Sequence, residues 1–317
     1  MRITAETMLE PFFKSDDREF LLARGDCVEQ MRSLDFCFDM IFADPPYFLS
    51  NGGISCRAGK VVSVNKGAWD KSEGREHDEN FTHDWISEAR RLLAPAGTIW
   101  ICCSMHNVSS IAKTLEALEF KILNFVTWAK TNPPPNITKR CFTHSTEFLI
   151  WARKSAKKSH FFDYELMKKI NGGKQMRDLW PLPAVPSRER RAGRHPTQKP
   201  LALVARTIAA TSREHSWILD PFCGSGTTGV AANLLGRRFL GIEREMEFLE
   251  LSRARKQEIE NAAAFAELRA SLGIPAKTDA PKAPNQPFEL SLEESAATFP
   301  NRKKQTDSDD IPLGEPF

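Results

Sequence analysis

Two short segments of the chain carry groups that could do chemistry. In Asp44-Pro-Pro-Tyr47, the Asp44 carboxylate and the Pro45 carbonyl are neighbouring hydrogen-bond acceptors, and Tyr47 offers an aromatic face. In Asp220-Pro-Phe-Cys-Gly-Ser-Gly226, the glycines would let the backbone approach a ligand closely. Each segment also has a purely structural interpretation, which is a rigid strand-ending turn for the first and tight packing for the second.

Each segment follows an apolar run that is typical of a buried strand, at 38–43 and 216–220. Two consecutive prolines cannot continue a helix or a central strand, so the first strand must end at Asp44. In a doubly wound sheet, loops at the carboxyl ends of strands beside the topological switch point line one crevice, however far apart they lie in sequence. We therefore expect the two segments to meet.

Predicted strands and helices alternate along the rest of the chain. Such alternation is typical of a mainly parallel sheet covered on both faces, which places the protein in the α/β class with a Rossmann-like, doubly wound fold. A short strand is predicted to open at Phe20, and the other strands at 38–43, 98–103, 122–128, 147–152, 216–220 and 239–243. Helices are predicted at 27–34, 82–93, 108–118, 200–210, 226–235 and 245–270, the last with a possible interruption.

Composition bounds the remaining segments and the setting of the protein. Residues 50–80 are polar and glycine-rich, which predicts a mobile loop, and 271–317 are proline-rich with few apolar residues, which predicts a disordered tail after one domain at 1–270. No apolar run reaches 18 residues and the first residues show no secretion signal, so we expect no membrane association. Seven scattered cysteines without a C-x-x-C pair argue against a disulfide framework and a zinc site, and favour a reducing cytosol.

The net charge of +3 hides a strong local asymmetry. Residues 130–194 contain 15 Lys and Arg against 5 Asp and Glu, a net charge of +10, while the rest of the chain carries −7. A concentrated cationic stretch favours a polyanionic partner, chiefly nucleic acid, although a solvated basic surface has the same composition.

Together these motifs resemble the S-adenosylmethionine-dependent amino-group DNA methyltransferases, whose marks are a D-P-P-Y loop and an F-x-G-x-G loop. The D-P-P-Y loop comes first here and Phe222-Cys-Gly-Ser-Gly226 comes late, an order similar to the permuted beta class of N6-adenine enzymes. The resemblance covers about residues 18–256, and its middle motifs are similar to the MboIIA and DpnA subgroup. Further stretches that look like this class are Gly25-Asp26-Cys27, Asn132-Pro-Pro-Pro-Asn136, Phe142-Thr-His-Ser-Thr-Glu147, Asn171-Gly-Gly-Lys-Gln-Met176, His195-Pro-Thr-Gln-Lys-Pro200 and Leu240-Gly-Ile-Glu243.

The resemblance implies methyl transfer to adenine N6 by direct in-line displacement, without a covalent enzyme intermediate or a metal. The exocyclic nitrogen is a poor nucleophile because its lone pair is delocalised into the ring. The Asp44 carboxylate and the Pro45 carbonyl can accept its two hydrogens and draw it toward sp³ geometry. Pro46 would help to fix this backbone, and Tyr47, with Phe48, would stack on a flipped-out base.

The resemblance also implies a cofactor site. Glu243 would accept hydrogen bonds from both ribose hydroxyls, and Asp26 would accept one from the adenine amine. Helix capping is an alternative role for both residues. Lys199 and Thr197 would bind the cofactor carboxylate. The implied cofactor-binding residues are Asp26, Cys27, Thr197, Lys199, Asp220, Phe222, Gly224, Ser225, Gly226 and Glu243.

For DNA, the resemblance makes 131–194 a target-recognition region. Aromatic residues are interleaved with its charges at Trp128, Phe142, Trp151 and Trp180, although tryptophans at strand positions are more typical of a core. Candidates for phosphate or base contacts are Lys139, Arg140, Lys174 and Arg177. The expected substrate is double-stranded DNA, with single-stranded DNA left open. The resemblance is compatible with a homodimer. It is also compatible with a cognate restriction endonuclease, or with an orphan modification enzyme that has none.

Two alternatives stay open at this point. N4-cytosine methylation uses the same in-line chemistry, but its loop usually begins with Ser, so Asp44 favours adenine. A catalytically inactive DNA-binding subunit is disfavoured by the intact Asp44, Tyr47, Phe222 and Gly224. C5-cytosine methylation needs a nucleophilic thiolate, usually in a Pro-Cys loop, and the chain has no Pro-Cys dipeptide.

Overall fold

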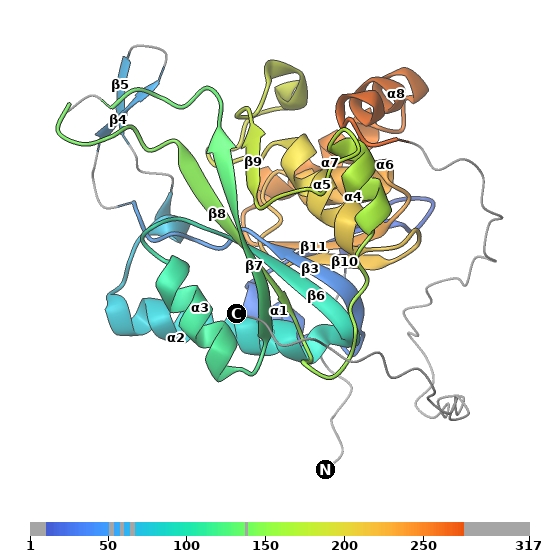
Figure 1. The fold of residues 1–317 in the computed structure, drawn as a ribbon, viewed down its shortest axis with the longest axis horizontal. Coiled ribbons are helices and arrows are strands. Elements are labelled where there is room, and N and C mark those ends of the chain that lie inside the picture. Colours follow the sequence, from blue (N-terminus) through green and yellow to red (C-terminus); the bar gives the residue numbers. More distant parts are fainter. Residues whose placement is uncertain (1–10, 51–53, 58–59, 64–66, 137–138, 276–317) are drawn as a thin grey trace. The chain divides into compact units, whose positions relative to one another are not determined.

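The computed structural model describes residues 11–50, 54–57, 60–63, 67–136 and 139–275. Nine of the described strands form one sheet, in the order β1-β2-β11-β10-β3-β6-β8-β7-β9 (Figure 1). These strands are β1 Pro11–Lys14, β2 Phe20–Arg24, β3 Phe38–Ala43, β6 Leu93–Cys103, β7 Lys121–Lys130, β8 Thr146–Arg153, β9 Leu179–Leu182, β10 Trp217–Asp220 and β11 Arg238–Glu243. A separate antiparallel pair joins β4 Ile54–Arg57 to β5 Lys60–Ser63.

The central strands of the sheet confirm the predicted doubly wound architecture. β2, β11, β10, β3 and β6 pair in parallel, and β10 lies directly beside β3. The chain proceeds from β3 to β6 on one side of this pair and from β10 to β11 on the other, so the topological switch point lies between β3 and β10. Asp44 follows β3 and Asp220 ends β10, so the two sequence motifs start at the same edge of the sheet.

The far side of the sheet is less regular than the predicted alternation. β8 runs antiparallel to both β6 and β7, and the short β9, absent from the prediction, pairs with β7. No helix is described between β7 and β8, and without such a crossover the chain returns in the opposite direction.

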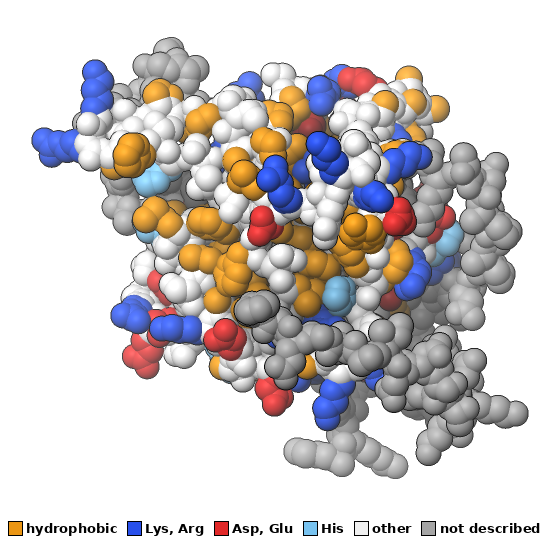
Figure 2. All heavy atoms as spheres, viewed as in Figure 1, with side chains coloured by type: hydrophobic (Ala, Val, Ile, Leu, Met, Phe, Trp, Pro, Cys, Tyr) orange, Lys and Arg blue, Asp and Glu red, His pale blue; other side chains and the backbone are white. Residues whose placement is uncertain are grey.

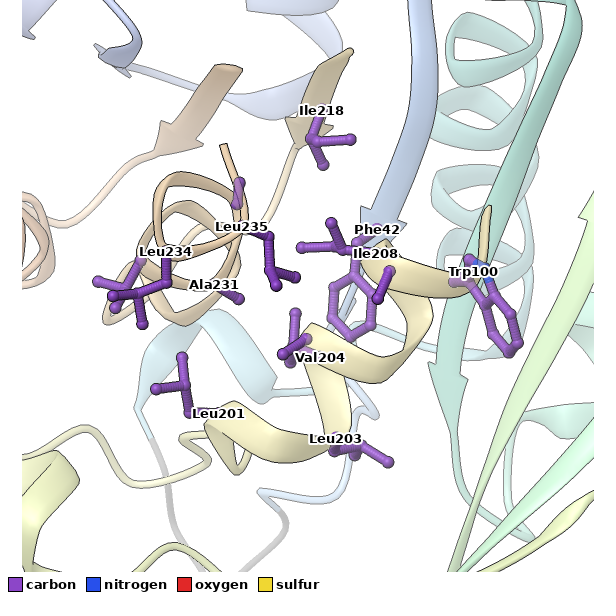
Figure 3. Packing of buried hydrophobic residues seen from close by; sticks show 14 of the residues in the cluster. Phe42, Trp100, Leu201, Leu203, Val204, Ile208, Ile218, Ala231, Leu234 and Leu235 are labelled. Carbon is purple, nitrogen blue, oxygen red and sulfur yellow. The ribbon is translucent and has the colours of Figure 1, made fainter. Parts of the chain in front are cut away.

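Helices cover both faces of the sheet. In Figure 1, α1 (Cys27–Ser33), α2 (Arg75–Leu92) and α3 (Val108–Ala117) lie on one face. The opposite face carries α4 Tyr164–Ile170, α5 Leu201–Thr211, α6 Thr227–Leu234, α7 Met246–Glu258 and α8 Ala262–Ser271. In the core under α5, Val204 and Ile208 lie beside Phe42 of β3, and Leu235 at the end of α6 closes the same cluster (Figure 3). Alternate strand residues such as Met40 and Phe42 supply this core, as period-2 burial requires.

One predicted helix starts at a different residue in the structure, and two predicted segments fall partly outside the described residues. α2 begins seven residues before its predicted start at Thr82, because its first turns are polar and carry no apolar periodicity. Parts of the predicted mobile loop 50–80, and the predicted tail from 276 onward, lie outside the described residues. The predicted final helix is interrupted between α7 and α8. Within the described ranges, no helix is both long and apolar enough to cross a membrane.

Candidate active site

A single cavity joins the two motifs, which we call the proline loop (Asp44–Phe48) and the glycine loop (Asp220–Gly226). Its volume of about 370 Å³ lies in the range of small-molecule sites. The predicted site residues that line it are Asp26, Cys27, Asp44, Pro46, Thr197, Lys199, Asp220, Phe222, Gly224, Ser225 and Glu243. Pro45 and Tyr47 line a second cavity on the other side of the proline loop, and Gly226 precedes α6 as its N-cap residue.

The start of the glycine loop is held by nearby residues, and its later residues contact α7. The buried Asp220 carboxylate accepts hydrogen bonds from the Phe222 amide at 2.9 Å and the Thr228 hydroxyl at 2.5 Å. Gly226 has a φ of +72°, and a Cβ there would lie 2.1 Å from the Ser252 hydroxyl oxygen, so only glycine fits. Burial raises the pKa of Asp220 to about 7.

Glu243 connects β11 to the glycine loop. Its Oε2 accepts the Gly224 amide at 2.8 Å, while Oε1 accepts the amides of Arg244 at 2.8 Å and Glu245 at 2.9 Å. Burial raises the pKa of this carboxyl group. The N-cap residue of α7 is Glu245, so Glu243 is not the cap of that helix, which was its alternative role. Glu243 instead presents an acceptor at the cavity wall.

The adjacent wall comes from the start of α1 and from the segment before α5. Asp26 accepts the amides of Val28 and Glu29 and so caps α1, while it also lines the cavity. The Cys27 thiol beside it is buried, which raises its pKa and keeps it neutral. Thr197 donates its amide to His195 Nδ1 at 3.3 Å.

His195 and two aromatic rings form the remaining wall. The imidazole stacks on Trp69 with ring centroids 6.1 Å apart and meets Phe248 edge-on at 4.2 Å. A Cβ at Gly224, where φ is +49°, would lie 3.3 Å from His195 Nε2, so the glycine loop packs tightly against this wall. Flat apolar surfaces beside the carboxylates of Asp26 and Glu243 fit a ligand with an aromatic ring and hydroxyl or amine donors, as S-adenosylmethionine has.

The proline loop places a buried ion pair in the same cavity. Lys199 Nζ lies 2.7 Å and 2.6 Å from the two Asp44 carboxylate oxygens, and the Tyr47 hydroxyl donates to Asp44 Oδ1 at 3.1 Å. Burial raises the pKa of Asp44, while the Lys199 charge opposes that rise. Burial lowers the pKa of Lys199, but the Asp44 and Glu147 carboxylates more than offset it, so this ammonium stays charged. Lys199 thus contacts Asp44, and its role toward a cofactor carboxylate stays a prediction.

Two residues that the sequence analysis did not assign extend this ion pair. Glu147 Oε1 accepts from Lys130 Nζ at 2.5 Å, and its Oε2 lies 3.7 Å from Lys199 Nζ and 3.5 Å from the Tyr47 hydroxyl. The only sequence signal for Glu147 is its place at the end of the Phe142–Glu147 motif. Two cations and two carboxylates thus alternate behind the proline loop.

Asp70 is a third unassigned residue, and it holds the backbone of the proline loop. Its side chain is fully buried, and its Oδ1 accepts the amides of Tyr47 at 2.9 Å and Phe48 at 3.0 Å. Its Oδ2 accepts the Ser50 hydroxyl at 2.8 Å. Phe48 has a φ of +56°, which is costly for a phenylalanine, and the hydrogen bonds to Asp70 stabilise that conformation. Nothing in its polar sequence surroundings marks Asp70.

The predicted DNA-contacting residues lie outside both cavities and are exposed. Lys139 and Arg140 belong to the connection between β7 and β8, and Lys174 and Arg177 lie between α4 and β9. Lys and Arg side chains gather in the upper part of the face in Figure 2, above a hydrophobic centre. Trp128 and Trp151 are buried, as their predicted strand positions indicate, and Trp180 is buried on the unpredicted β9, whereas Phe142 is 96% exposed. In the described part of the chain, no group of three His, Cys, Asp or Glu side chains could hold a metal ion.

Comparisons with known proteins agree with this geometry. Residues 38–254 match the DNA methylase family N6_N4_Mtase. Type II methyltransferase M2.MboI of Moraxella bovis is 52% identical over 252 residues, which are 79% of this chain and 92% of that protein. Type II methyltransferase M2.DpnII of Streptococcus pneumoniae is 50% identical over 250 residues, which are 78% of this chain and 92% of that protein.

Two solved structures share the fold. The M1.HpyAVI complex with SAM is 31% identical, with a TM-score of 0.58 over 75% of this chain and 98% of that chain. PvuII DNA methyltransferase, which is cytosine-N4-specific, has a TM-score of 0.62 over 84% of this chain and 95% of that chain. At 14% identity, the second structure indicates the fold alone, which is that of the class I methyltransferases.

Proposed function

The chain belongs to the DNA methylase family, and on that premise we propose that it is a site-specific, adenine-specific DNA methyltransferase using S-adenosylmethionine. The observation that carries this proposal is that Asp44 and Lys199 line the same cavity as the glycine loop and Glu243. We also propose that the chain belongs to the permuted beta class and, within it, to the MboIIA and DpnA subgroup. This assignment is supported by the proline loop preceding the glycine loop in sequence while the two meet in space.

The proposed acceptor chemistry follows from the ion pair. S-adenosylmethionine supplies an already activated methyl group when bound. The Asp44 carboxylate and the Pro45 carbonyl accept the two hydrogens of the adenine amino group and orient its lone pair. Lys199 keeps Asp44 ionised despite its burial, and Asp44 takes the proton that the amino nitrogen loses on methylation. Tyr47, with Phe48, provides the surface on which the flipped base stacks.

The cofactor roles rest on the shape and polarity of the cavity. Glu243 presents the acceptor for the ribose hydroxyls at the wall of the cavity. Asp26 and Cys27 form the corner for the adenine ring. Asp220, Phe222, Gly224, Ser225 and Gly226 shape the turn around the methionine portion, with Thr197 at its edge.

The partners follow from charge and from the relatives. We assign 131–194 as the target-recognition region of a catalytic domain at 1–270, with Lys139, Arg140, Lys174 and Arg177 as contacts to double-stranded or single-stranded DNA. The type II relatives come from bacteria and favour a restriction-modification setting in the bacterial cytosol or nucleoid. A homodimer and a cognate endonuclease stay predictions.

Nucleoside mass spectrometry of unmethylated DNA incubated with the protein and S-adenosylmethionine tests the proposal. We expect N6-methyladenine with the wild type and none with Asp44→Ala or without the methyl donor. N4-methylcytosine would keep the geometry and change the base. The absence of any methylated base on single-stranded and double-stranded DNA of diverse sequence would favour an inactive DNA-binding subunit.

A further inference from the structure

The four aromatic residues that the sequence analysis placed among the basic side chains differ in burial, and Phe142 is far more exposed than Phe162 (40%) and Tyr164 (41%) of the same region. Trp128, Trp151 and Trp180 are at most 6% exposed and belong to the core beside the sheet, whereas the Phe142 ring is 96% exposed. Single exposed hydrophobic residues are common on protein surfaces, so exposure by itself assigns no role. Its position beside the candidate active site and the charge around it distinguish Phe142.

Phe142 lies in a connection whose two ends are anchored at the candidate active site. The connection leaves β7 after Lys130 and enters β8 at Thr146, and its described residues are 131–136 and 139–145. Lys130 bonds Glu147, and Glu147 lies beside the Tyr47 hydroxyl. Phe142 is five residues from Glu147, so their Cα atoms can be at most about 18 Å apart. The ring therefore lies within reach of DNA whose target base occupies the site.

The connection has features that stiffen it. Three consecutive prolines, Pro133 to Pro135, restrict its first half to extended conformations. The Asn136 side-chain amide then donates a hydrogen bond to the Cys141 carbonyl at 3.0 Å, directly before Phe142. The described residues on either side of 137–138 are thus restricted, and they lose less conformational freedom on binding than a free chain would.

The charge of the connection selects a polyanion. Residues 131–146 contain Lys139 and Arg140 and no acidic residue, and both basic side chains are exposed just before Phe142. An apolar ring flanked by cations suits insertion between base steps, with the cations on the neighbouring phosphates. An acidic protein surface would pair with the two cations only, and an apolar surface would contact the ring only. Duplex DNA offers phosphates for the cations and stacked bases for the ring.

We infer that Phe142 inserts into the base stack of duplex DNA beside the target adenine and fills the space that the adenine leaves when it flips out. This inference rests on the proposed adenine methylation. The inserted ring stacks on the neighbouring bases and so offsets part of the unstacking and unpairing that flipping costs. It stabilises the flipped state without touching the reacting atoms, so Phe142 is a positioning residue.

The test compares two substrates that differ only in the cost of flipping. One is an unmethylated duplex oligonucleotide that contains the recognition site, which is identified beforehand by mapping the methylated product. The other is the same duplex with an abasic position opposite the target adenine. We expect Phe142→Ala to lower kcat/KM on the paired duplex by roughly 10–100-fold, and to stay within about 3-fold of wild type on the abasic duplex. Phe142→Trp, which keeps a stacking ring, should retain most activity on both.

The matched control is Phe265→Ala, which removes another exposed phenylalanine, on α8. It should leave both rates unchanged. An equal loss on both duplexes for Phe142→Ala, or no loss on either, would overturn the inference. A wild-type protein that methylates neither duplex would instead contradict the proposed function, so the two failures are distinguishable.

Discussion

The glycine loop and the proline loop start at neighbouring strands and serve one cavity, but they are held in different ways. The Asp220 carboxylate bonds groups two and eight residues further along the chain. The Asp44 carboxylate and the backbone after it are held by Lys199, 155 residues from Asp44, and by Asp70, 23 residues from Tyr47. In the cofactor half of the site, formed by the glycine loop and Glu243, the Asp220 carboxylate is therefore held by nearby residues. In the acceptor half, formed by the proline loop, the Asp44 carboxylate is held by residues that the fold brings together from far along the chain. Substitutions in the two halves should consequently affect different measurements.

The largest effect that would sharpen this contrast is expected for Lys199→Met. Removing the ammonium leaves the effect of burial on Asp44 unopposed, so the pKa of its carboxyl rises further and the protonated form is favoured. We expect kcat to fall by roughly 10²–10³-fold near neutral pH and to increase as the pH is raised. Lys121→Met, at an exposed position at the start of β7 and outside 131–194, serves as the control in kcat measurements across pH. A loss of kcat that does not depend on pH would contradict the role of Lys199 in keeping Asp44 ionised.

Asp70→Ala should give the next largest effect, again confined to the acceptor half. It removes the acceptor for two amides and the Ser50 hydroxyl and frees the strained Phe48 backbone. We expect kcat to fall by roughly 10–100-fold, since each lost charged hydrogen bond costs about 1.5–3 kcal/mol, with unchanged affinity for S-adenosylmethionine. Asp70→Asn, which keeps one acceptor oxygen, should recover part of kcat. Equal activity of Asp70→Ala and wild type would show that the proline loop holds its shape alone.

Glu243→Ala tests the cofactor half. Calorimetric titration should show the dissociation constant for S-adenosylmethionine increasing roughly 10–100-fold, the loss expected for hydrogen bonds to a carboxylate. The value of kcat at saturating cofactor should change little. Glu247→Ala, at an exposed position in the first turn of α7, is the matched control. A fall in kcat without a change in cofactor affinity would place Glu243 in the acceptor half instead.

The smallest effect concerns Asp220 and appears in stability. Its pKa of about 7 lies above its ordinary value of 3.8, so ionisation in the folded protein is unfavourable. Its contribution to stability is therefore full below the ordinary pKa and is lost as the pH rises through about 7. Thermal unfolding should show Asp220→Asn gaining a few degrees in Tm relative to wild type between pH 5 and pH 8. A Tm difference independent of pH would contradict the raised pKa.

The same contrast explains what the sequence predicted. The sequence predicted that Asp44, Asp220 and Glu243 share one cavity because each lies at the carboxyl end of a recognisable strand, and parallel topology brings these ends together. Asp70 and Glu147 were missed because their roles depend on partners brought near by folding, which no local spacing reveals. Lys199 was placed in the cavity, yet its pairing with Asp44 required the geometry. The antiparallel β8 was hidden because strand patterns carry no direction.

The measurement that tests the division of the site most directly is a paired one on Asp44→Ala. Cofactor affinity is measured by calorimetry, and methyl transfer is measured in a single turnover with saturating S-adenosylmethionine and DNA. The division predicts a dissociation constant within about twofold of wild type and a transfer rate reduced by roughly 10²–10³-fold. Cofactor affinity that falls in step with the rate, or a rate that survives the substitution, would contradict it.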